Sequence, residues 1–322
     1  MTLRWGILST ARINESFLGG VIESGTGTVV AVASRDAARA AGYAQGNGID
    51  RAHGSYEALL ADDDVEAVYI SLPNRLHMEW TRRALEAGKH VLCEKPLSRR
   101  TAEVAGAFNL AARRDRVLME AFMYRHHPQT ARLAELVASG AIGRPRIIRS
   151  SFSFVLDDPT DVRFSRDLDG GALMDLGCYC VSGARLLAGE VEHVTGLELI
   201  GGDGVDAAFV GSMRFPHGVL AHFDAGFVLA DRHDLEIVGD EASLVVADPW
   251  RCLAPGIELH RNGATERIAV PAANSYALQA ANFAAAVRGE APPLLGRTDA
   301  LGQARAIETL YQSAEAGVPI AV

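Results

Sequence analysis

The chain has 322 residues, of which 48% are hydrophobic and 22% are charged, and its formal net charge is −9. This composition is ordinary for a soluble globular protein, and the length suffices for two domains that each bury a core. The negative charge and the lack of a basic stripe argue against nucleic acid or an anionic membrane as the main partner.

Four cysteines are too few and too scattered for a disulfide framework, and the run Cys178-Tyr179-Cys180 lacks a second pair of metal ligands. We therefore expect reduced thiols and no bound metal. The apolar run that begins at Leu3 leaves no room for a leader sequence, and no later apolar stretch reaches membrane-spanning length. We expect a cytoplasmic protein.

Up to about Ala121 the sequence alternates short apolar runs with longer segments of helical period. That alternation predicts right-handed crossovers and a parallel sheet covered by helices on both faces. The expected strands are Arg4–Leu8, Thr28–Ala33, Ala67–Leu72, His90–Cys93 and Val117–Ala121. The expected helices are Ile13–Glu23, Asp36–Ala44, Ser55–Leu60, His77–Ala87 and Thr101–Arg114.

Beyond a helix that follows Pro128 and closes at Gly140, the pattern changes to long alternating segments separated by turn signals, which predicts a mostly antiparallel sheet. The expected strands are Arg146–Leu156, Glu192–Leu199, Ala207–Phe215, Val219–Leu229, Leu235–Val238, Ser243–Val246 and Ile257–Leu259, and the expected helices are Leu173–Leu187, Ser275–Arg288 and Asp299–Ala316. The predicted fold class is α/β: a doubly wound Rossmann domain over residues 1–122 and an α+β domain with a large open, mostly antiparallel sheet over residues 123–322.

The segment from Trp5 to Ile13 combines a strand, a tight turn and a helix start, which is where a doubly wound fold binds the pyrophosphate of a dinucleotide. The glycine fingerprint is degraded, because Gly6 is followed by Leu8 and Ala11 at its later positions, or by Ser9 in a shifted alignment. The candidate cofactor contacts in this segment are Gly6, Ser9, Thr10, Ala11, Arg12 and Ile13.

After the second strand, the sequence offers Ser34 and Arg35 where an NAD enzyme usually places an acidic residue. A hydroxyl and a guanidinium suit a 2′-phosphate, and Arg39 lies one helical turn further on, so we expect NADP, with NAD as the alternative. Two other interpretations remain. Ser34 caps the next helix while the arginines are merely solvated, or Asp36 binds a ribose 2′-hydroxyl.

Two lysines stand against twenty-nine arginines, and one of them, Lys95, follows the predicted strand His90–Cys93. Where a cation only solvates the surface this chain uses Arg, so Lys95 is a candidate for a role that needs a compact ammonium of tunable pKa. The alternative is an ordinary loop lysine.

Asp175 and Tyr179 lie four residues apart at the start of a predicted helix, and this spacing puts both side chains on one face. A phenol has a pKa near 10 and is a poor base at neutral pH, but the ammonium of Lys95 would favour the phenolate. Tyr179 would then exchange a proton with a substrate hydroxyl while Asp175 holds a second hydroxyl. Taken singly, Asp175 equally suits a helix start and Tyr179 a half-buried aromatic.

These residues resemble the glucose-fructose oxidoreductase / inositol dehydrogenase / MocA family of NAD(P)-dependent oxidoreductases. The motifs are Gly6 to Ile13, Val68 to Asn74 with His77, Glu94-Lys95-Pro96, Met119 to Arg125, and Gly170 to Gly177. The resemblance implies that Lys95 lies near the nicotinamide, that the peptide before Pro96 is cis, and that Arg125 lines the substrate cleft or supports its wall. It implies that the cofactor is bordered by Leu72, Pro73, Asn74, His77, Glu94 and Pro96.

Many members carry His where this chain has Tyr179, and Tyr resembles the branch with dimeric dihydrodiol dehydrogenase and NADP-dependent xylose dehydrogenase. The family's second domain commonly pairs sheets across a dimer, which implies a homodimer or higher homo-oligomer. Arg163 and Phe164 are candidate substrate contacts, with a plain loop as the alternative, whereas His126 and His127 are more typical of packing at a domain junction.

We therefore expect a dehydrogenase or reductase that transfers hydride between nicotinamide and a secondary alcohol or hemiacetal of a carbohydrate or cyclic diol. Its catalytic residues would be Tyr179, Lys95 and Asp175. The alternatives are a sugar-nucleotide ketoreductase, an NAD-dependent glycoside hydrolase, and a non-catalytic sugar or nucleotide sensor.

Overall fold

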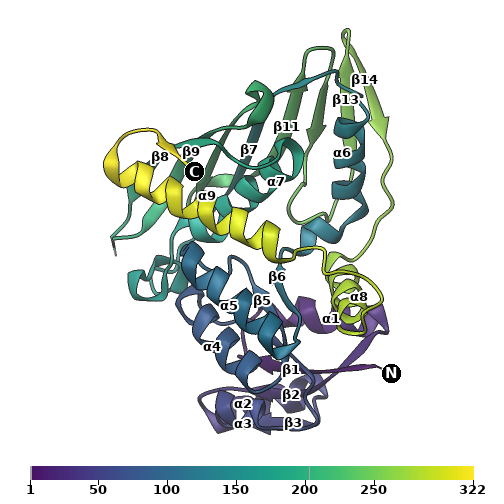
Figure 1. Ribbon diagram of the computed structural model, residues 1–322, viewed down its shortest axis with the longest axis vertical. Helices are drawn as coiled ribbons and strands as arrows, with labels where there is room; N and C mark the ends of the chain where they lie inside the picture. Colours follow the sequence, from purple (N-terminus) through teal and green to yellow (C-terminus); the bar gives the residue numbers. More distant parts are fainter. Residues whose placement is uncertain (1, 203) are drawn as a thin grey trace. The chain divides into compact units, whose positions relative to one another are not determined.

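The computed structural model describes residues 2–202 and 204–322. The chain forms two compact units, the first from Met1–His126 with Asn274–Leu301 and the second from His127–Ala273 with Gly302–Val322. The predicted fold class is confirmed, with a parallel sheet in the first unit and a mostly antiparallel sheet in the second (Figure 1). The two units do not follow the expected division at residue 122, because the segment Asn274–Leu301 packs with the first unit.

The first unit contains a six-stranded parallel sheet of order β3-β2-β1-β4-β5-β6 within the described residues. Its strands are β1 (Leu3–Leu8), β2 (Gly27–Ala33), β3 (Arg51–His53), β4 (Ala67–Ile70), β5 (His90–Glu94) and β6 (Leu118–Ala121). The connecting helices are α1 (Asn14–Ser24), α2 (Ala37–Asn47), α3 (Tyr56–Leu60), α4 (Asn74–Glu86) and α5 (Thr101–Arg114). All the predicted elements are confirmed to within a few residues, whereas β3 escaped prediction because it is short and only half-buried.

The strand order reverses between β1 and β4, which makes this point the topological switch of the sheet. Ser9, Ser34 and Ser71 directly follow β1, β2 and β4, and Lys95 directly follows β5. Because the strands are parallel, these four residues lie along the same edge, where a doubly wound fold binds its ligand.

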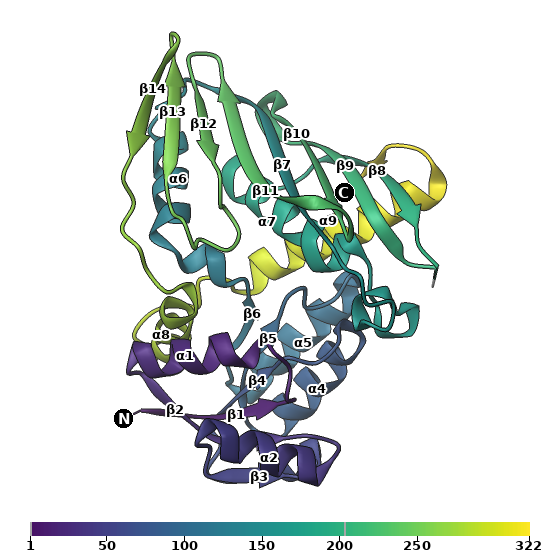
Figure 2. The ribbon, with the colours of Figure 1, turned by 180° about the vertical axis from the view of Figure 1, so that it is seen from behind.

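Helix α8 (Ser275–Val287) belongs to the first unit and lies beside α1 (Figures 1 and 2). A Cβ at Gly20 would lie 2.5 Å from the Tyr276 Cβ, so only glycine allows the two helices to approach this closely. Phe283 also packs against Trp5 of β1, with 4.9 Å between the ring centroids. The sequence predicted this helix but gave no signal of its partner.

Lys89 is buried, with 6% of its surface exposed, and its ammonium donates to the backbone carbonyls of Asp62 and Val65 at 2.7 and 2.8 Å. The lysine joins the segment before β5 to the segment before β4. Burial lowers the pKa of Lys89, with the charges of Asp63 and Asp62 opposing. A buried carbonyl pair of this kind is satisfied by a compact ammonium better than by a planar guanidinium.

The second unit contains a nine-stranded sheet of order β14-β13-β12-β11-β7-β10-β9-β8-β15 in the part of the chain that the structure describes. Its strands are β7 (Pro145–Val155), β8 (His193–Ile200), β9 (Asp206–Arg214), β10 (Leu220–Gly226), β11 (Val228–Gly239), β12 (Ser243–Val246), β13 (Ile257–Arg261), β14 (Ala264–Ile268) and β15 (Ile320–Ala321). The sheet is antiparallel except where β7 pairs with β10. The expected strand Val219–Leu229 runs across the junction of β10 and β11, and β14 was missed because it is almost wholly exposed.

Helices α6 (Pro128–Ala138), α7 (Cys178–Ala188) and α9 (Arg297–Ala316) cover one face of this sheet, while no helix among the described residues lies on the other face (Figures 1 and 2). Leu197 and Val210 pair on the open face and are 65% and 47% exposed. Further along the same face is a hollow of about 410 Å³ whose lining includes Arg149, His222, Asp224, Asp234 and Glu236.

Asp206 is a buried carboxyl at the start of β9, with 2% of its surface exposed. One oxygen accepts the backbone N–H of Leu173 at 2.6 Å and the other accepts the Tyr311 hydroxyl at 2.9 Å. Burial raises the pKa of Asp206 to about 7 against the opposing effect of these hydrogen bonds. The carboxyl thus sits in the core between the segment before α7 and helix α9.

Within the described residues, no helix combines the length and apolar character needed to cross a membrane. The cysteines Cys93, Cys178, Cys180 and Cys252 are buried free thiols, as expected from their spacing.

We predict that Lys89→Met lowers the free energy of unfolding by on the order of 2 kcal/mol, because two buried carbonyls lose their donor. Urea denaturation measures the change. Arg113→Met, at an exposed site on α5, is the matched control and should change stability by less than about 0.5 kcal/mol. A loss at Lys89 as small as that of the control would show that the two contacts contribute nothing.

Asp206 should make stability fall as the pH rises. Its folded pKa of about 7 lies above that of an unfolded aspartate, about 4, so between these values the folded state holds a proton that the unfolded state has lost. The contribution is full below pH 4 and is lost on approach to pH 7. From pH 5 to 7.5, the wild type should lose on the order of 2 kcal/mol relative to Asp206→Asn in urea denaturation.

Asp240→Asn is the control for this comparison, because Asp240 is exposed and hydrogen bonding to the Arg144 N–H lowers its pKa, so that it does not titrate in this range. Its pH profile should match that of the wild type. Parallel profiles for wild type and Asp206→Asn would contradict the raised pKa.

Candidate active site

The turn after β1 is held by a buried cluster of hydrogen bonds. The Ser9 hydroxyl contacts the Ser71 hydroxyl at 2.7 Å, and the Ser71 hydroxyl donates to the Asn14 side-chain oxygen at 2.6 Å. The Asn14 amide donates in turn to the Ser9 carbonyl at 3.0 Å. Ser9 has φ 136°, a conformation that favours glycine, and the Ala11 N–H donates to its hydroxyl. These contacts fix the turn from the end of β1 to the first residue of α1.

This geometry corrects the alignment of the fingerprint. Gly6 lies inside β1, and a Cβ there would lie 2.7 Å from the side chain of Leu59 on α3, so its glycine serves packing and not phosphate contact. Ser9 takes the tight-turn position of the motif, and Ala11 and Asn14 take the third and sixth positions. Thr10, Arg12 and Ile13 complete the connection, and α1 starts with no side-chain cap at Ile13. A short side chain at Ala11 and this uncapped helix start fit a pyrophosphate.

At the end of β2, Asp36 caps α2, with its Oδ1 accepting the Arg39 N–H at 3.0 Å. The Ser34 hydroxyl accepts the N–H of Asp36 and does not cap α2. Arg35 and Arg39 are exposed and both face the buried Tyr56. Burial raises the pKa of Tyr56, and the charge of Arg35 opposes that effect.

The connections after β4 and β5 are joined by His77. This residue is 1% exposed, and its ring nitrogens lie 2.7 Å from the Leu72 carbonyl and 2.9 Å from the Pro96 carbonyl. Burial lowers the pKa of His77, while the two carbonyls oppose the shift. Pro73 precedes α4, Asn74 is its first residue, and the Lys95-Pro96 peptide is cis, as the family resemblance predicted. His77 therefore braces the loop that carries Lys95.

Glu94 is the last residue of β5, and its carboxylate is held from within the sheet. It accepts the Tyr69 hydroxyl at 2.5 Å and the Lys95 N–H at 3.3 Å. Tyr69 is fully buried and stacks on Phe17, with 3.9 Å between the ring centroids. Glu94 thus orients the backbone of Lys95, whose side chain is half-buried.

In the second unit, Asp175 lies on a π-helical turn, η4 (Leu173–Gly177), that leads directly into α7. Its carboxylate accepts the Arg163 Nε–H at 2.6 Å, and Arg163 also pairs with Asp161 at 3.2 Å. The Asp175 charge raises the pKa of Arg163 above its already high value. A carboxylate bound to a permanent cation stays ionised and can accept hydrogen bonds from a ligand.

Tyr179 lies on α7, 9% exposed, against an aromatic wall formed by Phe152 and Trp250. Its ring centroid is 5.4 Å from that of Phe152, edge to face, and 6.2 Å from that of Trp250. No local pattern indicates this wall, because Phe152 comes from β7 and Trp250 from the loop after β12.

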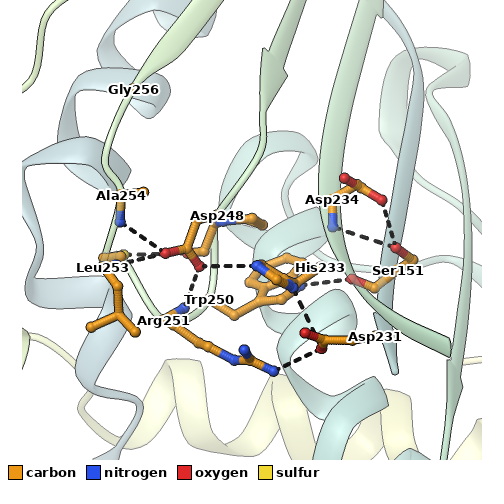
Figure 3. A network of polar contacts seen from close by, with 12 residues as sticks. Ser151, Asp231, His233, Asp234, Asp248, Trp250, Arg251, Leu253, Ala254 and Gly256 are labelled. Atoms are coloured by element: carbon orange, nitrogen blue, oxygen red, sulfur yellow. Dashed lines mark hydrogen bonds and ion pairs between the residues drawn. The ribbon is translucent and has the colours of Figure 1, made fainter. Parts of the chain in front are cut away.

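Polar contacts fix the loop that carries Trp250 (Figure 3). The Trp250 indole N–H donates to the Ser151 carbonyl at 2.9 Å, and the Asp248 carboxylate accepts the N–H groups of Leu253 and Ala254 at 2.6 and 3.1 Å. Gln129, buried on α6, donates to the Asp248 carbonyl at 2.9 Å. The aromatic wall is therefore a fixed surface.

The remaining candidates take structural positions. Arg125 pairs with Asp299 at 3.3 Å, which fits a supporting role, and Phe164 packs its ring on Phe227, with 5.7 Å between the centroids. His126 is half-buried, and its partial desolvation lowers its pKa to about 4, while His127 caps α6 by accepting the Gln129 N–H.

Two family models match this chain. The oxidoreductase family with an NAD-binding Rossmann fold matches residues 3–122, and the GFO/IDH/MocA C-terminal domain matches residues 130–245.

Among curated relatives, the chain is 39% identical to the D-xylose 1-dehydrogenase (NADP(+)) 2 of Haloferax volcanii over 99% of both chains. It is 32% identical to a trans-1,2-dihydrobenzene-1,2-diol dehydrogenase of Danio rerio, over 80% of this chain and 79% of that one. Among solved structures, a 3-ketoreductase from Actinomadura kijaniata, in complex with NADP and TDP-benzene, is 32% identical with a TM-score of 0.92 and covers 97% of this chain and 98% of its own. With the Rossmann unit, the second sheet and these relatives in agreement, the chain belongs to the GFO/IDH/MocA family of NAD(P)-dependent oxidoreductases.

Proposed function

We propose that this protein is an NADP-preferring dehydrogenase that oxidises a secondary alcohol or hemiacetal carbon of a free sugar or cyclic diol. The observation that carries the proposal is the arrangement on η4 and α7, where an ionised Asp175 and the Tyr179 phenol lie four residues apart. A relative that is 39% identical over nearly its full length is a D-xylose 1-dehydrogenase for NADP, which favours a sugar hemiacetal as the substrate group.

The cofactor would be held along the carboxyl edge of the Rossmann sheet. The turn from Ser9 to Ile13 would bind the pyrophosphate, and Arg35 and Arg39, both exposed, would bind a 2′-phosphate. The use of one Asp36 oxygen as the cap of α2 supports NADP over NAD, because that oxygen is not offered to a 2′-hydroxyl. Bound NADP supplies the hydride acceptor.

The proposed chemistry of the chain is a proton transfer at Tyr179. As the substrate carbon loses hydride, the Tyr179 oxygen takes the proton of the hydroxyl on that carbon, so an alcohol becomes a ketone and a hemiacetal becomes a lactone. Lys95 would favour the phenolate by its charge. Asp175, held ionised by Arg163, would accept a hydrogen bond from a second substrate hydroxyl. The aromatic wall would exclude water around the phenol.

The ketoreductase relative supports the pairing of Lys95 with Tyr179. It has also been solved with one lysine replaced and with one tyrosine replaced, and those two positions lie 84 residues apart, the separation between Lys95 and Tyr179 in this chain.

A sugar-nucleotide ketoreductase is the second candidate, favoured by the same relative and its bound TDP derivative. The other two alternatives are an NAD-dependent glycoside hydrolase and a non-catalytic sensor. Neither has comparable support. The exposed apolar side chains on the open face of the second sheet, such as Leu197 and Val210, further support a homodimer or higher homo-oligomer formed through that face.

Tyr179→Phe should lower kcat at least about 100-fold, because the ring and its packing remain while the proton carrier is lost. The assay follows absorbance of reduced nicotinamide with aldoses, inositols, cyclic diols and nucleotide-linked keto sugars. Binding of NADPH, measured by fluorescence, should be unchanged in the variant. Turnover within a few fold of the wild type on an active substrate would refute the assignment.

Arg35→Ala should raise KM for NADP about 10- to 100-fold and leave KM for NAD within about twofold, since only NADP carries the 2′-phosphate. Arg113→Ala, which removes an exposed arginine from α5 of the same unit, should change neither. Equal losses with both cofactors would exclude the phosphate contact.

A further inference from the structure

Asp175 and Tyr179 depend on an irregular piece of backbone. The π-helical turn η4 carries Asp175 and continues into α7, whose second residue is Tyr179. A π-helical turn is an uncommon geometry, and the first backbone N–H groups of any helix have no partner within it. The contacts at the start of the turn therefore bear on the positions of both side chains.

Asp206 makes those contacts. Its Oδ2 accepts the N–H of Leu173, the first residue of the turn, at 2.6 Å. Its Oδ1 lies so close to Gly171 that a Cβ there would be only 2.1 Å away, and Gly171 has φ 120°, which other residues rarely adopt. The Gly171 carbonyl in turn accepts the Asp175 N–H at 3.0 Å. Asp206 therefore contacts the backbone at Gly171 and Leu173, and Gly171 is the residue whose carbonyl accepts the Asp175 N–H.

Tyr311 holds the carboxyl from the other side. Its hydroxyl donates to Asp206 Oδ1 at 2.9 Å, and its ring packs edge to face on Phe209 of β9, with 5.7 Å between the centroids. The Asp206 carboxyl is therefore held between strand β9 and helix α9, both regular elements of the second unit. Burial and, to a smaller extent, the charge of Glu198 on β8 raise the pKa of Asp206.

We propose that Asp206, oriented by Tyr311, is a positioning residue of the active site: it sets the start of the π-helical turn and thereby the placement of Asp175 and Tyr179. The inference rests on the proposed function for its catalytic consequence. Asp206 itself contacts no reacting atom in this scheme.

Asp206→Asn keeps the size of the side chain but leaves one oxygen to serve two donors. With the sugar that the wild type oxidises fastest, it should lower kcat about 10- to 100-fold and leave KM for NADP within twofold. Tyr311→Phe, which removes only the Oδ1 donor, should show a smaller loss in the same direction. Asp240→Asn is the matched control, because Asp240 also accepts a backbone N–H from a distant segment, that of Arg144 at 2.8 Å, and should leave kcat unchanged.

A second readout separates mispositioning from a smaller folded fraction. Deuterium at the reacting carbon should give a larger isotope effect on kcat in Asp206→Asn than in the wild type, because misplacement slows the hydride step, whereas a reduced folded fraction leaves the isotope effect unchanged. A folded Asp206→Asn enzyme with wild-type kcat and isotope effect would overturn the inference. Should Asp206→Asn fail to fold, wild-type kcat and isotope effect in Tyr311→Phe would overturn it.

Failure of the proposed function is recognised independently. If the wild type oxidises or reduces none of the test substrates, the dehydrogenase assignment falls. Amide hydrogen exchange over residues 171–177 then tests whether Asp206 and Tyr311 hold the start of the π-helical turn. Faster exchange in Tyr311→Phe or Asp206→Asn than in Asp240→Asn supports this role of Asp206, and equal protection overturns it.

Discussion

The buried hydrogen-bond cluster of Ser9, Asn14 and Ser71 is the constraint on which the Rossmann site depends. It lies where β1 and β4 part and their connections leave toward opposite faces of the sheet. Each of these polar groups would cost about 1–3 kcal/mol if it were buried without a partner, so the three side chains hold one another and both connections in one arrangement. The arrangement extends through Leu72 to His77, and from His77 to the Pro96 carbonyl. The loop of Lys95 is thus tied to the turn where the pyrophosphate would bind.

In the second unit too, polar contacts from other segments hold the backbone near the candidate functional groups. Its candidate reactive groups lie on or directly after an irregular turn, and polar contacts hold this turn and the residues around it. Asp206 of β9 holds the first residue of η4, Arg163 holds the carboxylate of Asp175, and the indole N–H of Trp250 fixes one ring of the wall against Tyr179. In each unit, polar side chains from other segments contact the backbone or side chains of the segment that carries a candidate functional group.

The sequence predicted what depends on local periodicity and missed what depends on contacts between distant segments. Strands such as β1 and β5 are continuous apolar runs, so their positions were evident. The strand order, the return of α8 to the Rossmann unit and the Trp250 wall arise from packing between segments that are not adjacent in the sequence. Asp206 carried no signal either, because an aspartate after Gly204-Val205 is typical of a turn. Gly6 misled for the same reason: a glycine in a strand–turn–helix segment suggests phosphate contact, whereas Leu59 shows that it serves packing.

The scarcity of lysine was informative beyond Lys95. Lys89, the other lysine, is buried between two strand connections and donates to two carbonyls, a role in which a compact ammonium differs from a planar guanidinium. Since one of the two lysines is buried and donates to two backbone carbonyls, solvation of the surface is the weaker explanation for the other. Lys95 is half-buried, its backbone N–H contacts Glu94, and the carbonyl of Pro96 is held by His77. The backbone on both sides of the Lys95 side chain is therefore held by contacts within the first unit.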